Sequence, residues 1–550
     1  MLSYRKLAMR VLGRPLHTGG SDSPRPASQR AAALILTAAM LTTLTAPAFA
    51  KEWYIEEGDI TVRAGETEGT NKVSQGENPE VEDTNTVITN SDKDKASSNT
   101  VTIEAKDKDD KVEVTLKDVN IDTSSRSEAA VSVTGEGNTN IELDGDNALK
   151  SDIYSSGISS SGSLTISGGE NDSLTAQGGS GADGIYSSGS LTISGGTVTA
   201  NGGSGGDGGD GIWSSGGVTI SGGSTVTANG GDGKDDYGGD GIRSDSGDVT
   251  ISGGSTVTAN GGNGGNVSGD GIRSDSGDVT ISGGTVKAAG GDSKDGYGGD
   301  GIRSGGVTIS GGTVNAAGGN GGKVGGYGIC SFARVAISGG TVNAAGGNGK
   351  NSNGGSDGII SNDIDLSGSL ELTAKAGRPN GKAISWAGHE LDLDTIKDKL
   401  GPGAKVTATD ANGETKQVSS PIPRPVEPEE PEPVIPEESS SSSDGGSATP
   451  SAPASPLPGL TVTDKDGQRI SYTSTQSGNT LTVCVGRLTA SLRASLATLR
   501  QLRAEGIDTI TFQTILCSTT LSVDEPLAMG GEDAEAVLTH RLTASSLTVG

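Results

Sequence analysis

The sequence contains very few aromatic, cysteine or histidine residues. Aromatic side chains make up 3% of its 550 residues, and there are only three cysteines and three histidines. A zinc site is not expected, because the chain has no CxxC pair and no cluster of cysteine and histidine. The histidines also lie near no evident acid–base set, so a histidine-based catalytic centre is not indicated.

Positive charge is also scarce. The 41 Lys and Arg residues are outnumbered by 69 Asp and Glu residues, and the formal net charge is −28. Proteins that bind nucleic acid use Lys and Arg to neutralise phosphates, and here no Gly-rich phosphate loop follows a strand. Nucleic acid is therefore not an expected partner.

Long apolar runs are absent except near the N-terminus. A basic segment there is followed by AAALILTAAMLTTLTA at 31–46 and by Ala48-Phe49-Ala50, a small-x-small cleavage pattern. This arrangement predicts that residues 1–50 are a signal peptide. We expect an extracellular or cell-surface protein whose mature chain is not inserted in a membrane.

Glycine, in contrast, is abundant, with 92 residues, and much of it belongs to a repeat. The segment DGIRSDSGDVTISGG at 240–254 returns unchanged at 270–284, and looser copies begin at Asp183, Asp210 and Asp300. The spacing between copies is 27 or 30 residues. A fixed period of this length is typical of a solenoid in which each repeat forms one coil.

Apolar residues keep their place in every copy of this repeat. Three short segments per copy alternate apolar and polar residues, as in VTIS and TVTA, which is the pattern of β-strands. The sequence therefore predicts an all-β fold, a parallel β-helix, over residues 51–400. We expect irregular N-terminal coils at 51–155, regular repeats at 156–370 and a cap that ends at about residue 410.

The composition changes after the repeats. Residues 411–458 are rich in Pro, Glu and Ser, which predicts a disordered, extended linker. Residues 459–550 are expected to form a small α/β domain. Its helix is predicted from the spacing of Leu488, Leu492, Leu496, Leu499 and Leu502, between strands at TLTVCVG and IDTITFQTIL.

Two of the three cysteines lie near these two predicted strands. If the strands are adjacent and parallel, Cys484 and Cys517 come close enough for a disulfide, which an exported protein can form. The alternative is a pair of buried thiols. Cys330 lies in the repeats and has no partner.

One outward-facing position in each coil carries large side chains. It lies between the Ile and the Ser of the DGIxS segment, and its successive occupants are Tyr186, Trp213, Arg243, Arg273, Arg303 and Cys330. We call the first five residues the strip. Aromatic rings and guanidinium groups about 4.8 Å apart could bind sugar faces, hydroxyls or uronates of an extended glycan. Alternatively, the side chains stack on one another and only tile the surface.

A second column of the repeat is acidic. Like charges stacked at the coil spacing repel one another unless something offsets them, and calcium is a candidate cofactor because it prefers carboxylate and carbonyl oxygens. The alternative is that each Asp bonds its own turn. The proposed calcium ligands are Asp210, Asp235, Asp240, Asp270 and Asp300.

The segments WYIEEGDITV at 53–62, AAVSVTGEGNTNIELDGDNALKS at 129–151 and the ISGGTVTANGG coils carry a family resemblance. They resemble a broad family of exported bacterial β-helix proteins described as carbohydrate-binding domain proteins, similar in fold to polysaccharide lyases. The resemblance covers residues 51–400. It implies a right-handed β-helix with calcium sites that binds glycans without established catalysis. Where that family has a glycine-only run, this chain has DGIRS or DGIWS.

The expected function is therefore carbohydrate binding by a secreted or surface-associated, adhesin-like and non-catalytic protein, whose partner is a polysaccharide or a cell-surface glycan. Two alternatives stay open. A polysaccharide lyase has the same fold, but its catalytic centre is normally a local departure from the repeat, whereas these Arg and Asp residues form repeated columns. A passive surface spacer needs no ligand at all.

Overall fold

The computed structural model describes residues 51–421, except 68 and 353, and most of residues 460–549, with gaps at 465–467, 471, 478–479, 486–488, 505, 515–517, 524–526, 528–534 and 542–543. The expected signal peptide and residues 422–458 of the expected linker lie outside these described residues. The chain divides into two compact units, Met1–Glu427 and Pro428–Gly550. No helix among the described residues is long and apolar enough to cross a membrane.

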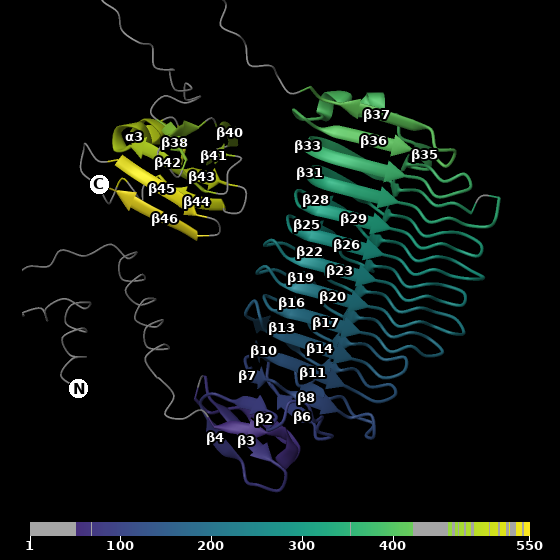
Figure 1. The fold of residues 1–550 in the computed structure, drawn as a ribbon, viewed down its shortest axis with the longest axis vertical. Coiled ribbons are helices and arrows are strands. Elements are labelled where there is room, and N and C mark those ends of the chain that lie inside the picture. The colour runs from purple at the N-terminus through teal and green to yellow at the C-terminus, as the bar shows by residue number, and fades with distance from the viewer. Residues whose placement is uncertain are drawn as a thin grey trace, which may run out of the picture. The chain divides into compact units, whose positions relative to one another are not determined.

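The described part of the first unit is the parallel β-solenoid that the repeat predicts (Figure 1). Each regular coil has three short strands, which we assign to a first, second and third face in chain order. Equivalent positions of successive coils pair in parallel and in register, so that Ile212 lies between Ile185 and Ile242.

The first face belongs to a 15-stranded sheet. Its parallel strands are β2 (Ile60–Ala64), β6 (Val101–Glu104), β9 (Val131–Thr134), β12 (Ile158–Ser160), β15 (Ile185–Ser187), β18 (Ile212–Ser214), β21 (Ile242–Ser244), β24 (Ile272–Ser274), β27 (Ile302–Ser304), β30 (Ile329–Ser331), β32 (Ile359–Ser361) and β34 (Ile384–Trp386).

The second and third faces join into a 22-stranded sheet, because β31 (Arg334–Ala345) and β33 (Asp363–Lys375) each run through both. The other strands of the second face are β1 (Glu52–Tyr54), β5 (Val87–Thr89), β7 (Lys111–Lys117), β10 (Asn138–Asp144), β13 (Ser163–Gly168), β16 (Leu191–Ile193), β19 (Val218–Ile220), β22 (Val249–Ile251), β25 (Val279–Ile281) and β28 (Val307–Ile309). Those of the third face are β8 (Asn120–Asp122), β11 (Asp146–Lys150), β14 (Ser173–Gln177), β17 (Thr197–Asn201), β20 (Thr225–Asn229), β23 (Thr256–Asn260), β26 (Thr285–Ala289), β29 (Thr313–Ala317) and β36 (Lys405–Thr409).

The interior of the solenoid is filled by columns of one side-chain type. Ile193, Ile220, Ile251, Ile281 and Ile309 form such a column, and each of them is 0% exposed. Because a residue packs on its own copy about 4.8 Å away, small branched side chains fill the space without voids. This packing explains why the repeats need so few aromatic residues.

Glycine-rich loops return the chain from the third face to the first. Their backbones pack directly on those of the neighbouring coils: a Cβ added at Gly269 would lie 1.8 Å from the carbonyl oxygen of Gly239, and one at Gly299 would lie 1.8 Å from that of Gly269. Bridges such as the one between Gly233 and Gly264 extend the parallel pairing into the loops. The high glycine content is therefore a packing requirement.

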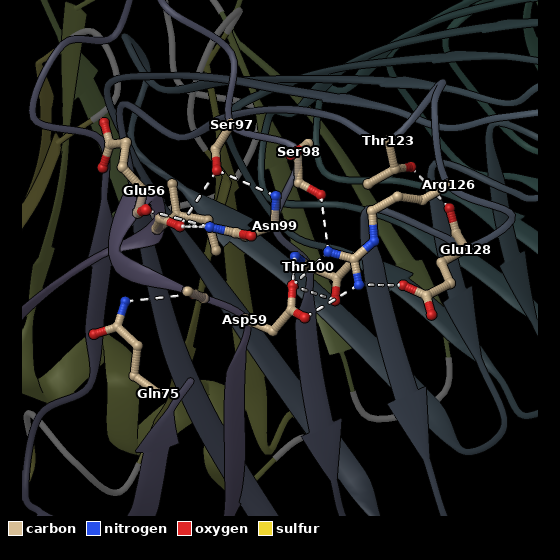
Figure 2. A network of polar contacts seen from close by, with 12 residues as sticks. Glu56, Asp59, Gln75, Ser97, Ser98, Asn99, Thr100, Thr123, Arg126 and Glu128 are labelled. Carbon is tan, nitrogen blue, oxygen red and sulfur yellow. Dashed lines mark hydrogen bonds and ion pairs between the residues drawn. The ribbon is translucent and has the colours of Figure 1, made fainter. Parts of the chain in front are cut away.

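Less regular coils form the N-terminal end, as expected. Here η1 (Ile55–Glu57) follows β1, and β3 (Asn71–Gln75) and β4 (Val81–Asp83) pair antiparallel beside β2. Figure 2 shows a polar network that ties these coils together: Arg126 donates to Asp59 at 2.8 Å and to Glu128 at 2.7 Å, and Asn99 donates to the carbonyl of Ile55 at 2.9 Å.

Antiparallel pairing also ends the C-terminal side of the solenoid. β35 (His389–Glu390) pairs with β34, η2 (Leu393–Lys399) follows, and β37 (Thr415–Ser419) pairs with β36. The first residues of the expected 411–458 linker therefore belong to a hairpin, which corrects that boundary. The turn contains Asn412-Gly413, a hairpin signal that the Pro and Glu content after it obscured, and Gly413 has φ of +91°.

The described part of the second unit contains two small sheets and one helix. One sheet has the order β39-β38-β42-β45-β46, and the other has the order β40-β41-β43-β44. The elements are β38 (Leu460–Thr463), β39 (Arg469–Ile470), β40 (Thr473–Ser477), β41 (Thr480–Cys484), β42 (Thr489–Ser495), α3 (Leu496–Ala504), β43 (Thr509–Gln513), β44 (Ser518–Ser522), β45 (Glu535–Arg541) and β46 (Ala544–Val549).

The predicted helix of this unit is too long. Only its second half, α3, is helical, whereas Leu492 lies in β42 and pairs with Val462 and Leu538. The leucine spacing was ambiguous because Ala490, Leu492 and Ala494 also alternate as strand residues with one buried face. Leu488 lies outside the described residues.

The two strands predicted on either side of the helix are present, and β41 and β43 pair in parallel as the disulfide hypothesis requires. The Sγ atom of Cys484 lies 3.5 Å from Oε1 of Gln513, the residue that pairs with it. The bond between Cys484 and Cys517 stays a prediction, because Cys517 lies outside the described residues.

The buried columns lead to a test of the fold. Ile251→Asp places a carboxylate without a partner in the interior, which should lower the free energy of unfolding by several kcal/mol. Thermal unfolding followed by circular dichroism measures this loss. The control is Thr250→Asp, which adds the same charge at the half-buried position next to it on β22. Equal melting temperatures for the two variants would show that the column is assigned wrongly.

Candidate binding groove

The acidic column of the repeat forms a continuous ladder along the solenoid. We use the name aspartate ladder for Asp183, Asp210, Asp240, Asp270 and Asp300. Each Oδ1 accepts the backbone N–H of the next residue in the column, at 2.7, 2.5, 2.6, 2.6 and 2.7 Å. The fifth bond goes to Tyr327, which interrupts the column. The side chains thus bond the neighbouring coil, rather than only their own turn.

The ladder carboxyls are buried, with at most 9% of each residue exposed. Burial raises the pKa of Asp183 and Asp300 to about 6, and that of Asp240 and Asp270 to about 7. The pKa of Asp210 is raised well above its ordinary value, first by burial and then by the carboxyls of Asp240 and Asp183. Loss of hydration disfavours the charged form, and neighbouring like charges add to the effect.

A second ladder, on the exposed loops, provides an internal comparison. Its members are Asp232, Asn263, Asp292, Asn320 and Asn348, and the Oδ1 of each accepts the N–H of the equivalent residue one coil further on, at 2.6–3.1 Å. Asn therefore also makes this bond, at 2.9–3.1 Å compared with 2.6–2.8 Å for Asp. The buried ladder nevertheless uses Asp at all five positions, where an ionised carboxyl is more costly.

The strip lies on the first face, and its five side chains are half-buried. Tyr186 meets Trp213 edge to face, with ring centroids 5.2 Å apart, and the guanidinium of Arg243 lies 5.0 Å from the centroid of the Trp213 ring. These contacts are the stacking that the surface-tiling alternative describes. They hold the strip in one conformation.

Carboxylates outside the ladder bond the arginines of the strip. Arg243 donates to Asp245 at 3.0 Å and to Asp275 at 3.1 Å, and Arg273 donates to Asp275 at 2.6 Å. The ladder is more distant: Arg273 lies 3.8 Å from Asp240, and Arg303 lies 3.6 Å from Asp300. Arg273 therefore joins a surface carboxylate to the ladder, whereas Arg243 bonds surface carboxylates and Arg303 lies near the ladder.

The strip and the ladder line a single groove of about 250 Å³. Its opposite side is formed by the loop residues Tyr237, Val267 and Ser268. Sequence analysis treated the two columns as separate candidate sites and missed Tyr237. The signal for it was present, because Tyr237 and Tyr297 occupy equivalent loop positions with Val267 between them, and all three are linked by parallel bridges. The members of the ladder that line the groove are Asp183, Asp210 and Asp240, and those of the strip are Trp213, Arg243 and Arg273.

Two buried polar atoms at these columns have no hydrogen-bond partner among the described residues. They are Nε1 of Trp213 and Oδ2 of Asp300, although the latter carboxyl has the distant ion pair with Arg303. Trp213 lines the groove, but this N–H group is itself buried within the protein. Buried polar atoms normally find a partner, so the two atoms are exceptions.

The expected calcium ligands do not converge. Among the described residues, no group of three or more His, Cys, Asp or Glu side chains is arranged to hold a metal ion. Asp235 lies on an exposed loop, whereas Asp210, Asp240, Asp270 and Asp300 form a row in which one oxygen of each already accepts a backbone N–H. The described residues therefore provide no cluster of ligands that would support the calcium hypothesis.

Both columns change character in the coil after Asp300. Tyr327 replaces the ladder residue and Cys330 replaces the strip residue. Burial and the nearby carboxyls raise the pKa of each to about 12. Cys330 is thus a buried, protonated thiol at the end of the strip.

Comparison with known proteins identifies these coils as beta helix repeats. The family model of that name matches residues 191–212, 218–242, 279–302 and 307–329. Each matched segment begins at a strand of the second face and ends in the next strand of the first face. The comparisons with curated proteins and with solved structures found no significant match.

The raised pKa values predict how the ladder affects stability. A carboxyl whose pKa is higher in the folded than in the unfolded state binds its proton more tightly on folding. The contribution of this carboxyl to the free energy of folding therefore becomes unfavourable as pH rises from about 4 to about 7. Asp270→Asn keeps the bond acceptor and removes the charge. At about 1.4 kcal/mol per pKa unit, the variant should be a few kcal/mol more stable than the parent at pH 8.

The measurement is urea unfolding of both proteins at several pH values. The difference in the free energy of unfolding between the variant and the parent should be near zero at pH 4 and should grow until pH 7. Asp292→Asn, in the exposed ladder, is the control and should show little pH-dependent difference. If Asp270→Asn were less stable than the parent at pH 8, the ladder would be stabilised by its charge.

Proposed function

We propose that the protein is a secreted or surface-associated, non-catalytic carbohydrate-binding protein that holds an extended glycan chain along the groove. The observation that carries the proposal is the groove itself, which aromatic side chains and a row of polar groups line together. Trp213 and Tyr237 provide apolar ring surface, and Asp210 and Asp240 provide hydrogen-bonding oxygens. Sugars combine an apolar ring face with hydroxyls at the edge. The aromatic rings of the groove are suited to the ring face, and the carboxyl oxygens are suited to the hydroxyls.

The repeat favours a polymer over a small molecule. Equivalent groups recur once per coil, about 4.8 Å apart, along the direction of the stack. A glycan chain repeats on a similar length scale, so successive sugars meet successive coils.

One observation favours a lyase as a second candidate. Asp240 and Asp270 have pKa values of about 7 and lie near Arg273, and a general base with such a pKa works well at neutral pH. A lyase removes a proton next to a uronate carboxylate that a cation neutralises. The two candidates differ in outcome, because only the lyase forms an unsaturated product.

A glycan-array screen of the full-length chain, with and without a chelator, tests the proposal. Bound glycans are then incubated with the protein while the absorbance of unsaturated uronates is recorded. Binding without new absorbance is the expected result, and rising absorbance would favour the lyase. The absence of any binding would leave the passive spacer as the remaining interpretation.

Substitutions test whether the groove is the site. Trp213→Ala should weaken glycan binding by tenfold or more, because a buried aromatic anchor in an interface commonly contributes about 2 kcal/mol. Thermal unfolding of the variant should stay close to the parent, since the side chain is only half-buried. Isothermal titration calorimetry measures the affinity.

Thr250→Ala, on the second face, is the matched control and should bind like the parent. An equal loss of affinity for Thr250→Ala and Trp213→Ala would place the binding site outside the groove.

A further inference from the structure

Resting on the proposed carbohydrate binding, we infer that the groove selects glycans that carry ammonium groups, such as polymers of an amino sugar, over neutral or uronate glycans. The inference begins from the charges of the groove. Three carboxyls, those of Asp183, Asp210 and Asp240, line it together with two guanidinium groups, those of Arg243 and Arg273. Sequence reasoning suggested that these arginines would bind uronates.

The two guanidinium groups already have carboxylate partners. Asp275 accepts from both of them, and Asp245 accepts from Arg243, at distances of 2.6–3.1 Å. A uronate that bonds their remaining N–H groups would lie close to these carboxylates and to the carboxyls of the ladder. Like charges at such distances disfavour each other, so the groove is unsuited to a polyanion.

The negative charge is least compensated at one end of the groove. In the coils of Asp183 and Asp210 the strip position is occupied by Tyr186 and Trp213, whereas the next three coils have arginine there. Among the described residues, the guanidinium of Arg243, which belongs to a later coil, lowers the pKa of both Asp183 and Asp210 against the effect of burial. This end therefore has carboxyls beside aromatic rings and lacks a cation of its own.

Carboxyls and aromatic rings together are suited to an organic cation. A carboxylate accepts charge-assisted hydrogen bonds from an ammonium group, and the face of an aromatic ring attracts the same charge. Tyr237 lines this part of the groove and is 51% exposed, so its ring is open to a ligand. The Trp213 ring already has Arg243 over it, which leaves Tyr237 as the expected ring partner.

The comparison of the two ladders supports a role for the carboxyl beyond structure. Asn can also make the bond between coils, as in the exposed ladder, where Asn263, Asn320 and Asn348 accept backbone N–H groups. In the buried ladder Asn would remove the penalty of burying a charge. Asp at all five positions is what a cation-binding row requires, because only the carboxyl can become negative when a cation arrives.

The experiment compares four probes of equal length on the full-length chain by isothermal titration calorimetry near neutral pH. They are oligomers of glucosamine, N-acetylglucosamine and galacturonic acid, and oligolysine. We expect the glucosamine oligomer to bind about tenfold more tightly than the N-acetylated one, since a charged partner strengthens a hydrogen bond. The galacturonic acid oligomer should bind most weakly.

Asp210→Asn tests the named carboxyl. The variant should lose about tenfold more affinity for the glucosamine oligomer than for the N-acetylated oligomer, because only the former needs the negative charge. Asp292→Asn is the matched control: it makes the same substitution in a ladder that bonds the next coil in the same way, but outside the groove. It should bind both oligomers like the parent.

The outcomes separate this inference from the proposed function. If the N-acetylated or galacturonic acid oligomer binds at least as tightly as the glucosamine oligomer, and Trp213→Ala weakens it, the groove binds glycans but the charge selection is wrong. If oligolysine binds as tightly as the glucosamine oligomer, the groove is a general cation site and the inference fails. If no sugar oligomer binds, the proposed function itself fails.

Discussion

Stacking of each side chain on its own copy is the constraint on which the rest of this solenoid depends. Residues one coil apart are paired in register and separated by about 4.8 Å, so every position must tolerate an identical neighbour above and below. Isoleucine and valine meet this condition in the interior, and glycine meets it in the loops, where Gly239 and Gly269 leave no room for a Cβ. Aromatic residues and prolines are correspondingly rare in the repeats.

The same constraint acts differently on polar residues. Asparagine satisfies it without penalty, as Asn229 shows by donating to Asn201 and accepting from Asn260. Aspartate satisfies the hydrogen bond but places buried carboxyls in a row, and the pKa of each rises. The arginines of the strip offset this charge in part, and Asp245 and Asp275 compete for them from outside. In the groove, the repeat therefore keeps an electrostatic strain, the cost of buried carboxyls, that asparagine would remove.

That strain is the physical reason to treat the groove as a binding site. The second and third faces carry mainly threonine, serine and asparagine, whose contacts repeat from coil to coil. A passive spacer needs only such faces. The groove adds aromatic rings and ionisable groups, which line one cavity.

The sequence by itself determined the solenoid, because apolar columns such as Ile185, Ile212 and Ile242 leave one register in which all of them are buried. It also placed the strip on the outside, since alternation fixes the face of each strand residue. It did not determine the extent of α3, because leucines such as Leu492 fit a strand and a helix equally well. Only the tertiary structure brought the aspartate ladder, the strip and Tyr237 into one groove. Their proximity depends on how the glycine loops fold back onto the first face, and glycine has no side chain whose pattern could reveal that path.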